Sequence, residues 1–230
     1  MKAKSFITLT MVFQSLCVLS QVNDASTNHL FAFNMDYARL GTVFNDMPLD
    51  NINGSPFLNE EFKNGFIQTR SDSIISLVLR YNVYNDAIEF KINDEIYAIK
   101  NNESLKMVTI EERVFMYKEF IKSNGTKHNG YLELLSHGKN ELYCRYRIRY
   151  YPRVPEEAYK EAIEPEFKMQ SLSFFYADSF TTPIEFSTKK QLSSLMDEKT
   201  QESIHKISRN RAIKYWNKED LTNLFTTLNK

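Results

Sequence analysis

Residues 73–99 read SIISLVLRYNVYNDAIEFKINDEIYAI, and the strand pattern of the chain is clearest in this stretch. From Ser73 to Tyr84 two sets of residues alternate, and one set is clearly more apolar, which is the pattern of a β-strand with one buried face. The short segments 85–86 and 93–95 are rich in Asn and Asp, which favour tight turns. Because each segment lies between β-rich runs, the stretch predicts antiparallel strands joined as hairpins.

Further strand-like runs continue this pattern beyond the opening stretch. They lie at residues 106–110, 113–117, 131–135 and 142–151. Several short strands at such spacing are typical of an antiparallel meander. We therefore expect an α+β fold that is mainly antiparallel β, in which a β-meander forms a curved or barrel-like sheet.

The C-terminal part of the chain changes to helical spacing. Thr188 with Gln191 forms a capping-box pattern at a helix start. Asn217 with Asp220 marks another start, and apolar residues follow it at helical intervals. The meander is thus followed by a C-terminal group of short helices. The expected division of the chain is a signal peptide (1–20), a leader segment (21–56), an antiparallel β domain (57–151), a connector with a candidate β-hairpin (152–187) and a short helical tail (188–230).

The N-terminus has the layout of a secretory signal peptide. Two lysines precede an apolar stretch from Phe6 to Leu19, and the expected cleavage lies before Gln21. The stretch is shorter than the roughly 20 apolar residues of a spanning helix. Two alternatives stay open, namely an uncleaved anchor and a lipoprotein modified at Cys17. The expected location is outside the cytoplasm, either periplasmic or extracellular and associated with the cell envelope.

The composition limits the partners. The chain has 29 Lys and Arg against 29 Asp and Glu residues, and loss of the signal peptide would make it slightly acidic. This balance gives no general attraction to nucleic acid. The expected partner is an envelope protein or a glycan, with no nucleic acid and no stable membrane insertion after signal cleavage. Cleavage would leave Cys144 as the one cysteine, which excludes an intramolecular disulfide.

Two short segments carry a resemblance to a group of exported proteins. Residues 54–62 read GSPFLNEEF, and residues 79–90 read LRYNVYNDAIEF. These segments resemble stretches of small exported proteins of unknown function of the Bacteroidota, and the similarity extends over residues 54–230. The resemblance implies an envelope location and a layout of strands followed by helices. It implies no catalytic residues.

No motif of a known catalytic chemistry is present. The chain has no GxSxG, P-loop, dinucleotide fingerprint or CxxC. Its Ser-x-x-Lys matches lack the supporting elements of serine acyl enzymes. The histidines have no metal-ligand spacing. They are His29, His128, His137 and His205. We therefore expect no catalytic residues, no metal site and no cofactor.

The most distinctive chemical pattern is YCRYRIRYYPR at residues 143–153. On one strand, alternate residues share a face, which would carry an arginine ladder between tyrosine rings. Arginines bind carboxylates, phosphates and sulfates bidentately, so this face is the candidate ligand-binding site. Its residues are Tyr143, Arg145, Arg147, Arg149 and Tyr151, continued by Arg153.

The alternative for this pattern is a solvated face whose arginines pair with Glu133 or Glu141 on a neighbouring strand. The net charge near zero favours this alternative. Cys144 falls on the opposite face, where we expect a buried, inert thiol.

The expected function is a non-enzymatic binding or scaffolding module of the cell envelope, because an export signal and an aromatic-rich sheet occur without catalytic motifs. Two alternatives stay open. One is a secreted hydrolase whose site is assembled only by folding, and the other is a structural accessory of a membrane complex. A deep pocket with convergent Glu, Asp or His side chains would favour the enzyme, whereas a groove along a sheet would favour binding.

Overall fold

The structure is a computed structural model, and it describes residues 37–39, 51–92, 94–99, 102–156, 158–159, 161–179, 181–210 and 212–230. The expected signal peptide (1–20) lies outside these residues, as does the leader segment (21–56) apart from 37–39 and 51–56. Within the described residues, no helix combines the length and the apolar content that a membrane crossing requires.

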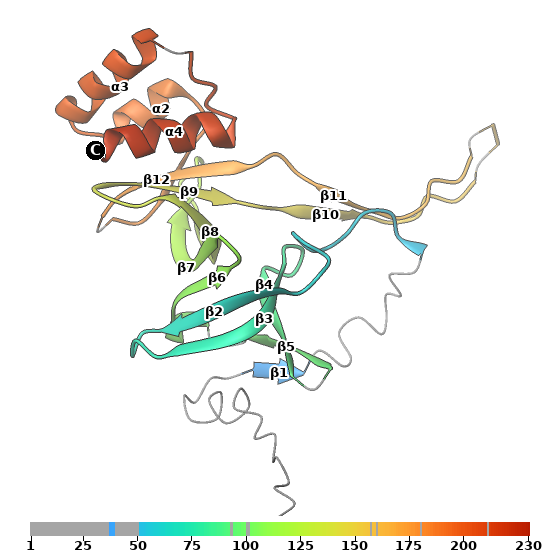
Figure 1. The fold of residues 1–230 in the computed structure, drawn as a ribbon. Helices are drawn as coiled ribbons and strands as arrows, with labels where there is room; N and C mark the ends of the chain where they lie inside the picture. Colours follow the sequence, from blue (N-terminus) through green and yellow to red (C-terminus); the bar gives the residue numbers. More distant parts are fainter. Residues whose placement is uncertain are drawn as a thin grey trace, which may run out of the picture.

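Most of the regular secondary structure in the described chain is β, and the α-helices follow the strands in sequence (Figure 1). The strands are β1 (Tyr37–Arg39), β2 (Lys63–Thr69), β3 (Ile74–Asn82), β4 (Ala87–Ile92), β5 (Glu95–Ile99), β6 (Leu105–Ile110), β7 (Arg113–Ile121), β8 (Lys127–Ser136), β9 (Asn140–Arg145), β10 (Ile148–Tyr151), β11 (Glu166–Met169), β12 (Ser173–Asp178) and β13 (Ile184–Phe186). The helices are the 3₁₀ turn η2 (Asn102–Ser104) and the α-helices α2 (Lys189–Ser194), α3 (Glu198–Asn210) and α4 (Lys218–Leu228). The expected α+β class is confirmed.

The first half of the fold is an antiparallel sheet in the order β1-β5-β4-β3-β2-β6-β7. The opening stretch 73–99 forms β3, β4 and β5 as consecutive hairpins, with Leu79 opposite Phe90 and Phe90 opposite Tyr97. Buried and exposed residues alternate along β3. The strand alternation therefore predicts both the hairpins and the core face of this sheet correctly.

The second half of the fold is a strand ring, formed by β7, β8, β9, β12 and β13. Neighbouring strands pair antiparallel around it. β13 then returns to β7 through one parallel residue pair, Ile184 with Ile121. The interior is an apolar cluster of its own, made of Phe120, Leu132, Tyr143, Phe175 and Ala177. Because β7 belongs to both halves, the sheet is curved and barrel-like, as expected.

The hairpin expected within residues 152–187 is present, and it is part of the ring. β12 and β13 pair with Phe174 opposite Phe186, and both rings are buried in the main core. β12 also pairs with β9 along its length. Residues 152–187 therefore supply two strands of the ring, in addition to connecting the β domain to the helices.

The prediction of one continuous strand over residues 142–151 is wrong. β9 ends at Arg145, and β10 starts at Ile148 and pairs with β11 in a separate two-stranded sheet. Between them Tyr146 is buried, and its hydroxyl donates to Glu133 Oε2 at 2.5 Å. The apolar alternation in the sequence continues through this break. Alternation indicates extended backbone, but it carries no information on where a chain leaves one sheet and enters another. β10 and β11 then run away from the ring as an arm (Figure 1).

The helical tail packs on the sheet, above β9 and β12 (Figure 1). Three apolar side chains of α4 are buried, and the Phe225 ring lies 6.1 Å from the Tyr176 ring of β12. Both predicted helix starts are confirmed. The Thr188 side chain accepts a hydrogen bond from the Gln191 amide, and the Asn217 side chain accepts one from the Asp220 amide.

The two segments that carry the resemblance pack on each other. The Arg80 guanidinium lies 3.4 Å from the centroid of the Phe57 ring and 4.4 Å from that of Phe62. Its Nη2 donates to Glu89 Oε2 at 2.6 Å, and Asn82 Nδ2 donates to Glu89 Oε1 at 2.7 Å. These residues thus have packing roles, and residues 54–62 and 79–90 stabilise each other in the first half of the fold.

Candidate functional site

Strand β7 changes partners on one of its edges. On that edge β6 pairs with residues 113–115, and β13 pairs at Ile121. β8 covers the opposite edge from Val114 to Ile121. No strand in the described part of the chain pairs with residues 116–120 on the first edge. β6 and β13 therefore diverge around an open stretch of β7.

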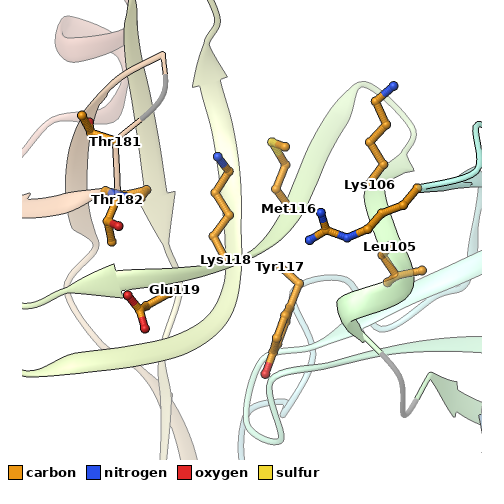
Figure 2. Close-up of a pocket in the computed structure, with 10 residues that line it drawn as sticks. Leu105, Lys106, Met116, Tyr117, Lys118, Glu119, Thr181 and Thr182 are labelled. Atoms are coloured by element: carbon orange, nitrogen blue, oxygen red, sulfur yellow. The ribbon is translucent and has the colours of Figure 1, made fainter.

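A cleft of about 380 Å³ lies at this open stretch, and we call it the β7 cleft. Its volume is within the range of small-ligand sites. Figure 2 shows Met116 and Lys118 on one side of β7, and Tyr117 and Glu119 on the other. The remaining lining residues come from the β2–β3 turn, β6 and the approach to β13, and they are Arg70, Leu105, Lys106, Thr181, Thr182 and Pro183.

The β7 cleft carries an excess of positive charge. Its cations are Arg70, Lys106 and Lys118. Among the lining residues the one carboxylate is Glu119, and it pairs with Lys127 at 2.9 Å, outside the lining set. This arrangement favours an anionic ligand.

Each of these cations is held differently. Arg70 Nε donates to the Glu103 carbonyl at 2.5 Å. Lys106 Nζ lies 2.7 Å from Asp72 Oδ1 in a pair that is more than half exposed, and this hydrogen bond lowers the pKa of the Asp72 carboxyl. Lys118 Nζ lies 5.1 Å from the centroid of the Tyr143 ring, and within the described residues it forms no ion pair. Lys118 is therefore the cation most available to a ligand.

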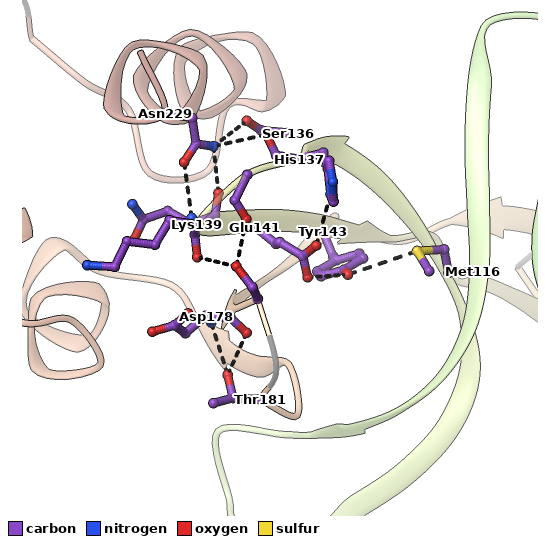
Figure 3. Close-up of polar contacts among 12 residues, drawn as sticks. Met116, Ser136, His137, Lys139, Glu141, Tyr143, Asp178, Thr181 and Asn229 are labelled. Carbon is purple, nitrogen blue, oxygen red and sulfur yellow. Dashed lines mark hydrogen bonds and ion pairs between the residues drawn. The ribbon is translucent and has the colours of Figure 1, made fainter.

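From the Tyr143 ring, a chain of polar contacts runs from the ring interior to the exposed His137 at the surface (Figure 3). The Tyr143 hydroxyl donates to Glu141 Oε2 at 2.8 Å and lies 4.0 Å from Met116 Sδ. Glu141 Oε1 lies 3.0 Å from His137 Nδ1. Burial, together with the bond to Glu141, raises the pKa of Tyr143 well above its ordinary value. The phenol therefore stays protonated and keeps donating to Glu141.

Two of the sequence-predicted site residues, Tyr143 and Arg145, share a face, but this face is the interior of the strand ring. Arg145 Nη2 lies 3.0 Å from Asp86 Oδ2, and its guanidinium carbon lies 4.6 Å from the centroid of the Phe120 ring. A Cβ at Gly130 would lie 2.3 Å from Asp86 Oδ2, so the contact needs glycine there. Arg145 thus connects the ring to the β3–β4 turn.

The other sequence-predicted residues lie outside the ring. Arg147 is exposed, and its Nη2 donates to Ser173 Oγ at 3.4 Å. Arg149 lies on the arm, with its guanidinium carbon 5.1 Å from the centroid of the Tyr151 ring. The structure therefore does not bring the five predicted ligand-binding residues together on one surface. Ligand binding by Arg147, Arg149 and Tyr151 stays a prediction.

Tyr151 lines a different depression, which lies on the arm and has a volume of about 560 Å³. Exposed Val154 and Ile163 contribute apolar surface to it. Its charged residues are of both signs, since Glu164, Glu166 and Lys168 all line it. The excess of one carboxylate is smaller than the excess of positive charge in the β7 cleft, so this surface selects a ligand by charge less strongly.

Neither of the carboxylates suggested as partners for the arginine ladder pairs with a described arginine of that ladder. Glu133 accepts from Lys218 Nζ at 2.7 Å, and Lys218 also donates to the Tyr146 hydroxyl at 2.8 Å. The expectation of ion-paired arginines holds for Arg145, but its partner is Asp86. Cys144 is buried as expected, and burial raises the pKa of its thiol to about 12, which makes it a poor nucleophile.

Sequence reasoning missed the cations of the β7 cleft because they are far apart along the chain. One local signal was available. Met116 and Phe120 are interior positions of β7, and Lys118 is a charged residue at the position between them in the same alternation. A charge in an apolar face marks a place where that face meets solvent or a partner.

A metal centre finds no support in the described residues, where no three His, Cys, Asp or Glu side chains gather closely enough to hold an ion. The cations of the β7 cleft are instead suited to anionic groups brought by a ligand. Comparisons of the chain with protein-family models, with curated proteins and with solved structures gave no match.

Proposed function

We propose that this protein is an exported, non-enzymatic binding module that holds an anionic ligand in the β7 cleft. The observation that carries the proposal is the open edge of β7 beside Lys118, which forms no ion pair within the described residues. The export part of the proposal rests on the signal-like N-terminus.

The local charge supports this function, because the whole chain is neutral. With a formal net charge of +0, Arg70 and Lys118 still form a local concentration of positive charge after Asp72 offsets Lys106. Lys118 is partly buried against the Tyr143 ring. Charges in such partly enclosed places are screened less by salt than fully exposed charges are.

The shape of the site favours binding over hydrolysis. The β7 cleft is an open groove along a strand, and its single lining carboxylate already has a partner. A hydrolase would need a carboxylate pair, or a nucleophile with its base, at the ligand. A structural accessory remains the second alternative, and binding of a free ligand by the isolated protein would speak against it.

The test is a binding measurement with two labelled polyanions, polyglutamate and oligogalacturonate, on the chain from Gln21 onward. The variant is Lys106→Gln with Lys118→Gln. We expect it to bind at least one of the polyanions about tenfold more weakly, since each cation should contribute roughly 0.5–1 kcal/mol.

The matched control is Lys190→Gln with Lys199→Gln, which removes the same charge from exposed positions on the helices. This control should bind as the unmodified protein does, and thermal unfolding should show that both variants remain folded. If neither polyanion binds, the proposal is refuted. An equal loss in both double variants would also refute it, because the attraction would then be general and not local.

A further inference from the structure

The backbone of β7 gives the cleft a second recognition element besides its charge. The Ile121 amide donates to the Pro183 carbonyl at 2.8 Å, so it points toward the β13 edge. Along a strand, backbone N–H and C=O groups of alternate residues point toward the same edge. The N–H and C=O groups of Glu119 and Tyr117 therefore also point toward this edge, where they face the cleft.

We propose that the β7 cleft binds an extended acidic peptide segment, which adds to β7 as a strand and bonds the backbones of Tyr117 and Glu119. This inference rests on the proposed function and names the class of its ligand. The open stretch 116–120 is about 17 Å long at the usual rise of roughly 3.3 Å per residue. This length matches a short strand, and strand addition to an exposed sheet edge is a common mode of peptide recognition.

The side chains around the open edge specify the pattern of the peptide. Figure 2 shows Lys106 and Lys118 on the same side of β7, while Tyr117 lies on the other. Side chains of an added strand would alternate between these two sides. Acidic residues would then meet the lysines, and apolar residues would meet the Tyr117 ring. The expected ligand is a segment of alternating acidic and apolar residues.

The competing explanation for Lys118 is protection of the edge. Proteins often place lysines on open edges to prevent pairing with other chains. On that explanation Lys118 prevents pairing with strands that carry no acidic group. The cleft then needs no peptide ligand. The two explanations differ in what an acidic strand does, so a peptide ligand separates them.

The test uses a labelled peptide of alternating valine and glutamate and two derivatives, one N-methylated at the valines and one at the glutamates. N-methylation removes the N–H groups that point to one edge of the peptide and leaves those of the other edge. Strand addition therefore predicts that one derivative binds at least tenfold more weakly, while the other binds about as well as the parent peptide.

The outcomes separate the two proposals. If the parent peptide, both derivatives and oligogalacturonate bind equally, the anionic site stands and strand addition is refuted. If oligogalacturonate binds and the peptide does not, the peptide class is refuted and edge protection is supported. If no probe binds, both proposals fall. Lys118→Gln, compared with Lys190→Gln, shows whether the peptide occupies this cleft, and equal binding by both variants would refute that location.

Discussion

At the scale of single residues, buried ion pairs join neighbouring strands in one case and the two halves of the fold in another. Arg80 pairs with Glu89 beneath the Phe57 ring, and the Glu89 side chain is 1% exposed. Arg145 pairs with Asp86 at the junction of the two halves. A charge buried in this way is tolerated because its partner is present, and removal of one partner leaves the other uncompensated.

Arg80→Met tests this at the better buried pair. The variant keeps much of the apolar stem but leaves the Glu89 carboxylate buried without its cation. We expect the free energy of unfolding, measured in urea, to fall by about 3–5 kcal/mol. Arg149→Met is the control, because Arg149 is exposed on the arm, and it should change stability by less than about 0.5 kcal/mol. Equal free energies of unfolding for the two variants would show that the Arg80–Glu89 pair does not stabilise the fold.

At the scale of elements, helix α4 is fixed to the sheet at both ends. At its start Lys218 donates to Glu133. At its end the Asn229 side chain forms hydrogen bonds with the β8–β9 turn, as Figure 3 shows. Its Nδ2 donates to the Asn140 carbonyl at 2.8 Å and to Ser136 Oγ at 3.1 Å, and its Oδ1 accepts from the Asn140 amide at 3.0 Å. An amide is needed here, because the site requires a donor and an acceptor together.

Asn229→Asp should loosen this end of the tail. The substitution preserves shape and replaces the donor with an oxygen that faces acceptor groups, so we expect a loss of about 1–3 kcal/mol. The measurement is urea unfolding together with limited proteolysis of the C-terminus. Asn223→Asp is the charge-matched control at an exposed position of the same helix. A tail that is equally resistant in both variants would argue against the Asn229 contact.

The elements also show where sequence reasoning succeeds. The caps at Thr188 and Asn217 and the alternation along β3 are local, so a short window of sequence contains all the information that they need. At the break between Arg145 and Ile148, Tyr146 contacts Glu133 and Lys218, which are distant in sequence. No periodicity within residues 142–151 carries that information, so an interrupted pair of strands was predicted as one.

At the scale of the whole molecule, β7 is the element that the two halves share. It ends the antiparallel meander through β6 and closes the ring through β13. The β7 cleft is the consequence of this double role, since β6 and β13 meet β7 at different places on one edge. A curved or barrel-like sheet could be predicted from strand spacing. The cleft could not, because it depends on which strands pair across the closed ring.

Strand addition at the β7 cleft requires that β7 has an open edge that accepts an acidic strand. Amide hydrogen exchange along β7, measured by NMR with and without the valine–glutamate peptide, tests it most directly. We predict that the amides of Tyr117 and Glu119 exchange quickly in the free protein and slowly with the peptide bound. The amides of Lys118 and Phe120, which point toward β8 by the same alternation, should be protected in both states. Tyr117 and Glu119 amides that are already protected in the free protein, or that stay unprotected at saturating peptide, would contradict the claim.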